Sequence, residues 1–153
     1  MFKDLPLELY ECRLNSKDIE KLQELVSDFY KIPKETLEKV KVRFTHLPEI
    51  WLYVIKRIGN YIQIVYRSIG KILGLCNPEK GKIFVEERLP FFQKIKTLIH
   101  EYTHIAQYTL GMFSRKSKRE LEEEADKVSD YLSKIYTQAS QKFPSSSSYL
   151  ILI

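Results

Sequence analysis

The 153-residue sequence is poor in cysteine and has no long uninterrupted apolar segment. Its two cysteines, Cys12 and Cys76, lie far apart and form no CxxC pair, which argues against a disulfide framework and against a cysteine-rich metal site. No apolar run approaches the roughly 18 residues that a membrane-spanning helix needs. The first residues, Met1 to Pro6, begin no apolar segment typical of a signal peptide. We therefore expect a cytoplasmic protein without a membrane partner.

A nucleic-acid-binding pattern is also missing. The net charge is only +5, and basic and acidic residues are interspersed along most of the chain. The densest basic run, Arg115 to Arg119, is followed at once by acidic residues and matches no nucleic-acid-binding motif. We interpret this run as a solvated loop and expect no nucleic-acid partner. With 44% hydrophobic and 29% charged residues, the composition is that of a globular domain that can bury a core.

What the sequence does contain is a series of amphipathic segments. Apolar residues at helical spacing and capping signals predict helices over 17–30, 33–37, 90–110 and 119–138, with Ser16 as the first N-cap and Gly111 as a helix stop. Alternating residues predict a strand over 40–45, and two short extended segments around a Pro/Gly turn predict a hairpin within 72–86.

The segment 49–69 is harder to interpret. Its apolar residues recur at three- and four-residue steps, which predicts a long amphipathic helix weakened at Gly59. Its isoleucines and tyrosines would also suit strands. Together the segments predict an α+β fold with a small, mostly antiparallel sheet packed against the two C-terminal helices and with additional N-terminal helices. We expect one domain over 1–142, followed by a Ser-rich linker and an apolar tail at 143–153.

The segment with the most chemical content is His100-Glu101-Tyr102-Thr103-His104. Histidines at positions i and i+4 of a helix lie one turn apart, so two imidazole nitrogens can meet one zinc ion at roughly 2.0–2.1 Å. Glu101 would lie beside that ion, where it can take a proton from a zinc-bound water and pass it to a leaving amine. The opposite face of the helix is apolar and should pack on the core: Ile95, Leu98, Ile99, Tyr102, Ala106 and Thr109.

A catalytic zinc site needs a third protein ligand and one open position. The remaining histidine, His46, is interpreted as an ordinary surface or hydrogen-bonded residue. A better source is the acidic run that starts at Glu122, eighteen residues past His104, on a helix whose core face is Leu121, Ala125, Val128, Leu132 and Ile135. Helix phase slightly favours Glu124, which lies closer to that apolar face, whereas Glu122 and Asp126 share one flank a turn apart.

An HExxH helix followed on the next helix by E-x-x-A-D resembles the gluzincin metallopeptidases. The small size and the hairpin before the HExxH helix are similar to the single-domain minigluzincins, over roughly residues 70–138. The resemblance implies a zincin-like domain in which His100, His104 and Glu122 hold Zn²⁺ and Asp126 supports His100. It also implies that Glu101 assists peptide-bond hydrolysis.

The resemblance implies a substrate as well. In such peptidases an edge strand pairs with a peptide or protein substrate in extended form, and we expect Lys82–Glu86 to do so. A tyrosine often stabilises the oxyanion in related enzymes, but the sequence does not choose among the ten tyrosines, which include Tyr131 and Tyr136. We expect the apolar end Ile151 to Ile153 either to pack on a surface groove or a neighbouring chain, or to occupy the cleft and make the enzyme latent. The alternative function is a catalytically inactive zinc-binding regulatory or interaction domain. A third interpretation is a basic interaction protein in which the HExxH pattern arose by chance. Cleavage preference and oligomeric state do not follow from the sequence.

Overall fold

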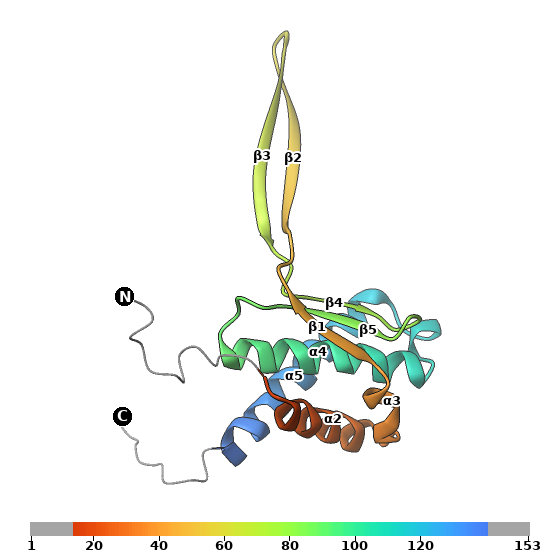
Figure 1. The fold of residues 1–153 in the computed structure, drawn as a ribbon. Coiled ribbons are helices and arrows are strands. Elements are labelled where there is room, and N and C mark those ends of the chain that lie inside the picture. Colours follow the sequence, from red (N-terminus) through yellow and green to blue (C-terminus); the bar gives the residue numbers. More distant parts are fainter. Residues whose placement is uncertain (1–13, 141–153) are drawn as a thin grey trace, which may run out of the picture.

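The computed structural model describes residues 14–140, which form an α+β fold (Figure 1). Its elements are α2 (Ser16–Tyr30), α3 (Lys34–Glu38), β1 (Lys41–Thr45), β2 (Glu49–Ile58), β3 (Tyr61–Lys71), β4 (Gly74–Asn77), β5 (Lys82–Glu86), α4 (Phe91–Thr109), the 3-10 helix η2 (Met112–Ser114) and α5 (Lys118–Ser140). The predicted fold class is confirmed. Cys12 and the predicted tail lie outside the described residues.

The small sheet has three strands in the order β1-β5-β4. Strand β5 is central, pairing with β1 in parallel and with β4 in an antiparallel register. Its residues Ile83 and Val85 are fully buried, so one face of the strand belongs to the core. The three-stranded sheet is therefore mixed. When the separate pair β2–β3 is included, two of the three strand pairings in the described chain are antiparallel.

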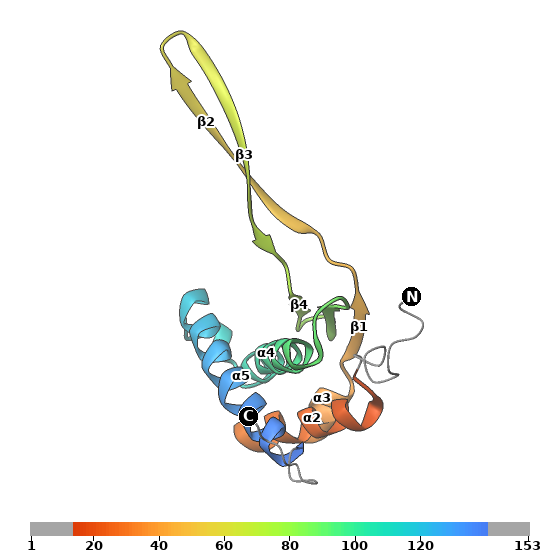
Figure 2. The ribbon, with the colours of Figure 1, turned by 90° about the vertical axis from the view of Figure 1, so that its left-hand side faces the viewer.

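Helix α4 lies beneath this sheet, with α2 and α5 on its other side (Figures 1 and 2). This position explains why nearly every residue from Lys94 to Gln107 is buried. Of its predicted core face, Ile95, Leu98, Ile99, Tyr102 and Ala106 are fully buried. Thr109 is exposed instead, because it is the last residue of the helix. The predicted core face of α5 is confirmed at Leu121, Ala125, Val128 and Leu132, and Ile135 packs against the core.

The helix ends follow local signals. The N-cap of α2 is Asn15 rather than the predicted Ser16, because Asn15 and Asp18 form a reciprocal capping box. The Asn15 side chain accepts from the Asp18 N–H at 2.9 Å, and the Asn15 N–H donates to the Asp18 carboxylate at 3.1 Å. Helix α4 follows Pro90, and Gly111 comes just after its end with a φ of 73°, as expected for a C-terminal glycine.

The prediction of a helix over 49–69 is wrong. This segment forms the antiparallel hairpin β2–β3, in which Ile58 pairs with Tyr61 across the two-residue turn Gly59-Asn60. Gly59 has a φ of 60°, the conformation that a type II′ hairpin turn requires at its first central position. The hairpin stands away from the rest of the protein in both views (Figures 1 and 2).

Candidate metal centre

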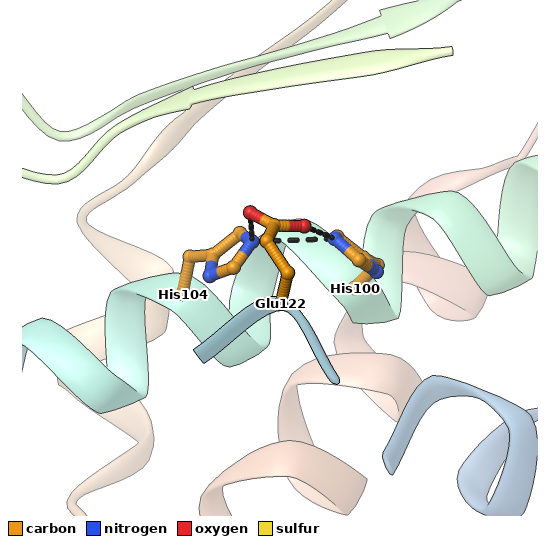
Figure 3. Close-up of side chains that lie close together, drawn as sticks. All are labelled: His100, His104 and Glu122. Atoms are coloured by element: carbon orange, nitrogen blue, oxygen red, sulfur yellow. Dashed lines mark hydrogen bonds and ion pairs between the residues drawn. The ribbon is translucent and has the colours of Figure 1, made fainter. Parts of the chain in front are cut away.

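Three side chains from two helices converge on one point (Figure 3). His100 and His104 lie one turn apart on α4, and their Nε2 atoms are 3.2 Å apart. Glu122 comes from α5, with one carboxylate oxygen 3.1 Å from Nε2 of His100 and the other 3.0 Å from Nε2 of His104. The structure therefore brings Glu122, and not Glu124, to the two histidines.

The outer nitrogen of each imidazole faces an oxygen. Nδ1 of His100 lies 3.1 Å from a carboxylate oxygen of Asp126, and Nδ1 of His104 lies 2.8 Å from the amide oxygen of Gln107. Because these oxygens accept hydrogen bonds, each Nδ1 carries a proton. When the rings are neutral, both Nε2 atoms turn a lone pair towards the carboxylate of Glu122. Such an arrangement of a histidine and an outer oxygen is typical of metal-ligating histidines.

With neutral rings, the two Nε2 atoms and the two carboxylate oxygens are four acceptors that repel each other, and a cation between them removes the repulsion. A tetrahedral ion bound at 2.0–2.1 Å needs ligand atoms roughly 3.3 Å apart, which is close to the observed spacing. Burial and the neighbouring His104 lower the pKa of His100 below its ordinary value, against the opposing effect of the carboxylates of Glu122 and Asp126. The neutral imidazole that a metal needs is thus favoured. This group of His100, His104 and Glu122 could hold a metal ion.

Gln107 is a site residue that the sequence interpretation missed. It is fully buried, and its amide nitrogen donates to the carbonyl oxygen of Leu121 at 3.1 Å and to the carboxylate of Glu124 at 3.3 Å. These two bonds fix which end of the amide faces His104. The sequence feature that could have identified Gln107 was its position three residues after His104, which places it on the same side of the helix.

Glu124 has a structural role. Its carboxylate accepts hydrogen bonds from the hydroxyl of Tyr30 and from Nζ of Lys116, which is 2.8 Å away. Its side chain is also less exposed than that of Glu122, at 23% against 47%. Helix phase was therefore correct that Glu124 lies nearer the core. It did not identify the residue that faces the histidines, because that face is the flank of α5.

Glu101 is buried, with 6% of its surface exposed, and it lines the cavity beside the histidines. Burial raises its pKa to about 8, and the negative charge of Glu122 adds to the effect. Gly74 of β4 makes this position possible. A Cβ atom on Gly74 would lie 2.8 Å from a carboxylate oxygen of Glu101 and 2.7 Å from Cγ2 of Thr97. The strand can approach α4 this closely only because residue 74 has no side chain.

A cavity of about 590 Å³ opens over the cluster. Besides Glu101 and the three converging side chains, its lining includes Leu75 and Cys76 of β4 on one side and Phe113, Lys116 and Leu121 on the other. A smaller cavity of about 330 Å³ reaches His100 and Glu101 from the opposite end of β4, past Leu73 and Thr97. Strand β4 thus borders the site along its length.

This arrangement corrects the expectation for Lys82–Glu86. That segment is β5, the middle strand of the three-stranded sheet, so neither of its edges is available to a substrate. The free edge beside the site belongs to β4 instead.

The remaining predicted residues lie elsewhere. His46 is a surface residue, 62% exposed, with Nε2 2.9 Å from a carboxylate oxygen of Glu87. No tyrosine of the described chain lines either cavity at the cluster. Tyr136 donates to the carboxylate of Asp18, and Tyr131 is mostly exposed. The prediction of a solvated loop over Arg115 to Arg119 is only partly correct, because Lys118 and Arg119 belong to α5. Lys116 is half-buried and lines the larger cavity.

Comparison of the chain with protein-family models, curated proteins and solved structures gives no match. Among the described residues, no helix combines the length and the apolar character needed to cross a membrane.

Proposed function

We propose that this chain is a small zinc-dependent peptidase of the minigluzincin type. The observation that carries the proposal is the orientation of the cluster. The outer oxygens of Asp126 and Gln107 hold the two imidazoles by Nδ1, so that both Nε2 atoms face the carboxylate of Glu122. With neutral rings these atoms are all acceptors, and unsatisfied acceptors facing one another are costly unless a cation lies between them.

The donor set supports zinc as the ion. Two imidazole nitrogens and one carboxylate, with a side open to the cavity, are the ligand types of catalytic zinc sites. When bound, the ion would supply Lewis-acid chemistry, lowering the pKa of water and polarising a substrate carbonyl. The residues of the chain would then hold the ion through three ligands and leave one position free.

Glu101 is proposed as the general base and acid. It directly follows His100, lines the same cavity and lies close to the backbone of Gly74. From this position beside the cluster, its carboxylate could take a proton from the attacking water and release it to the leaving amine.

The free edge of β4 is proposed as the substrate platform. A peptide in extended form can pair with the backbone of an edge strand, which fixes its direction and register. Strand β4 lies next to α4 and borders the cavity at Gly74, Leu75 and Cys76. A peptide paired there would run past His100 and Glu101, so one of its carbonyl groups can reach the free position of the ion.

The proposal is tested by elemental analysis together with a peptide-digestion assay, on full-length protein without a histidine tag. We expect one zinc per chain and turnover for the wild type. Glu101→Ala should keep the zinc and lose turnover by about 10²–10⁴-fold. Glu122→Ala should lose the zinc, whereas Glu123→Ala, at the exposed neighbouring position, should behave as the wild type.

Two outcomes would reject the proposal. A wild type without stoichiometric zinc would show that the cluster holds no such ion. A wild type with zinc but no turnover that depends on Glu101 would favour the alternative, a catalytically inactive zinc-binding domain.

A further inference from the structure

The hairpin β2–β3 is separate from the three-stranded sheet, and within the described chain its strands pair with each other alone. Both views show it standing away from the rest of the protein (Figures 1 and 2). A strand with a single neighbour leaves one row of backbone N–H and C=O groups unpaired. An isolated two-stranded hairpin is also only marginally stable in water, since independent stability needs three or more strands.

In the sequence of the hairpin, apolar residues occupy both the odd-numbered and the even-numbered positions. On β2 the run is Ile50-Trp51-Leu52-Tyr53-Val54-Ile55, and on β3 it includes Ile64-Val65-Tyr66. Because alternate residues of a strand belong to opposite faces, the sequence places apolar residues on both faces of the ribbon. Apolar sequence and unpaired strand edges are features that favour pairing with another chain.

The charges distinguish the two edges. Strand β3 carries cations but no acidic residue, whereas β2 has Glu49 at one end and Lys56 and Arg57 near the other. Two β3 strands brought together would have no opposite charge to pair. Two antiparallel β2 strands would bring the acidic end of each against the basic end of the other, so β2 is complementary to itself.

The turn indicates which residues of β2 face its free edge. In a hairpin closed by a two-residue turn, the residues flanking the turn form a hydrogen-bonded pair, and the two kinds of pair alternate from there. Starting from the pair Ile58–Tyr61, the pair Tyr53–Tyr66 is of the non-hydrogen-bonded kind. The backbone N–H of Tyr53 therefore points out of the free edge of β2, and that of Tyr66 points out of the free edge of β3.

We propose that two copies of this chain associate by pairing β2 with β2 of the second copy, antiparallel and with Tyr53 opposite the partner's Tyr53. A two-fold axis at this residue places Trp51 opposite the partner's Ile55 and Leu52 opposite the partner's Val54. The same register places Glu49 opposite the partner's Arg57, on both sides of the axis. The result is one four-stranded sheet. This association is independent of the proposed peptidase activity.

An anionic lipid surface is the other partner that the basic residues of the hairpin would favour. A lipid surface covers only one face of the ribbon, however, and backbone groups left unpaired in hydrocarbon are costly. A second copy satisfies the β2 edge and pairs the charges as well, so the second copy is the occupant that the hairpin favours.

The test measures the mass of the full chain by sedimentation equilibrium over a range of concentrations. The wild type should reach twice the 18.2 kDa chain mass. Tyr53→Pro removes an outward N–H from the β2 edge. It should raise the dimer Kd at least about tenfold, which corresponds to a loss of about 1.4 kcal/mol in association free energy. Tyr66→Pro is the matched control, because it makes the same change at the paired position on the β3 edge and should leave the dimer intact.

A charge exchange tests the register. Glu49→Arg should weaken the dimer about tenfold, because two attractive pairs become repulsive, and Glu49→Arg combined with Arg57→Glu should restore it. The proposal is overturned by a wild type that stays monomeric, or by proline variants that respond alike or in the opposite order. It is also overturned if the double exchange fails to restore association. Monomeric protein that sediments with phosphatidylserine vesicles would assign the hairpin to a lipid surface instead.

Discussion

Nδ1 of His104 lies 2.8 Å from the amide oxygen of Gln107, and that amide is itself held by the carbonyl of Leu121 and the carboxylate of Glu124. The orientation of His104 is thus determined from within the core, through a side chain without exposed surface. His100 is held differently, by Asp126, whose side chain is 73% exposed. The two histidines of the cluster therefore have supports of unequal rigidity.

This difference gives a prediction for Gln107→Leu, which removes the acceptor and keeps the volume. The imidazole of His104 would lose its fixed tautomer, and zinc affinity should fall about 10–100-fold, as expected when the partner of a ligating histidine is lost. Competition with a chromophoric chelator measures the affinity. Gln23→Leu is the control, because Gln23 is also buried but bonds to Tyr102, away from the cluster. Equal affinities of the two variants would contradict the role of Gln107.

Metal removal should lower the stability of the wild type. An ion that binds the folded state alone stabilises it by about 2.7 kcal/mol when its free concentration is a hundred times the Kd. Thermal unfolding with and without a chelator measures this contribution as a shift in Tm. His100→Ala should show no chelator effect, and His46→Ala, at an exposed position outside the cluster, should respond as the wild type does. A chelator effect that survives in His100→Ala would place the ion elsewhere.

The cluster and its supporting helices were predictable because their signals are local. Histidines four residues apart on one helix must share a face, and apolar spacing alone places that face against or away from the core. Local sequence signals do not determine whether Glu122 or Glu124 faces the histidines. The choice depends on how α5 is rotated against α4, which is set by the packing of Leu121 and Ala125 and by the bonds of Glu124 to Tyr30 and Lys116.

The hairpin was mistaken for a helix because its sequence lacks a polar face. When both faces of a ribbon are apolar, apolar residues occur at nearly every position, and steps of three and four arise as readily as steps of two. The better signal was the dipeptide Gly59-Asn60, with β-branched and aromatic residues on both sides. Gln107 and Gly74 were missed for another reason, since their roles are contacts with residues that only the folded chain brings near.

Gly74→Ala should destabilise the protein and disturb Glu101. The added Cβ would lie 2.7 Å from Cγ2 of Thr97 and 2.8 Å from the Glu101 carboxylate, so β4 or α4 must shift. We expect a loss of about 1–3 kcal/mol in the free energy of unfolding, typical of overpacking a filled site. Urea denaturation measures it. Thr97→Ser removes the clashing methyl group. Gly74→Ala should therefore cost less stability when it is introduced into the Thr97→Ser variant than into the wild type. An equal cost in both would mean that the contact with Thr97 does not limit the approach.

Glu86 should make stability depend on pH under acid conditions. Its side chain is buried and accepts hydrogen bonds from the guanidinium of Arg88 at 2.7 and 2.9 Å and from the backbone N–H of Leu47 at 2.7 Å. The guanidinium of Arg88 holds the pKa of Glu86 far below its ordinary value, helped by the backbone N–H groups of Leu47 and Arg88, while burial acts in the opposite direction. His46 also faces this carboxylate, at 3.6 Å.

The sign of the effect follows from the lowered pKa. The unfolded chain takes up a proton at Glu86 near pH 4.5, whereas the folded chain does so only at much lower pH. The stabilisation from ionised Glu86 is therefore complete above pH 4.5 and is lost progressively as the pH falls below it. Glu86→Gln should cost about 1–3 kcal/mol at neutral pH and flatten the acid limb of the stability curve, because the charge-assisted bonds are gone at every pH. Urea titrations between pH 3 and pH 7 compare the two proteins, and parallel curves would show that another carboxylate governs acid unfolding.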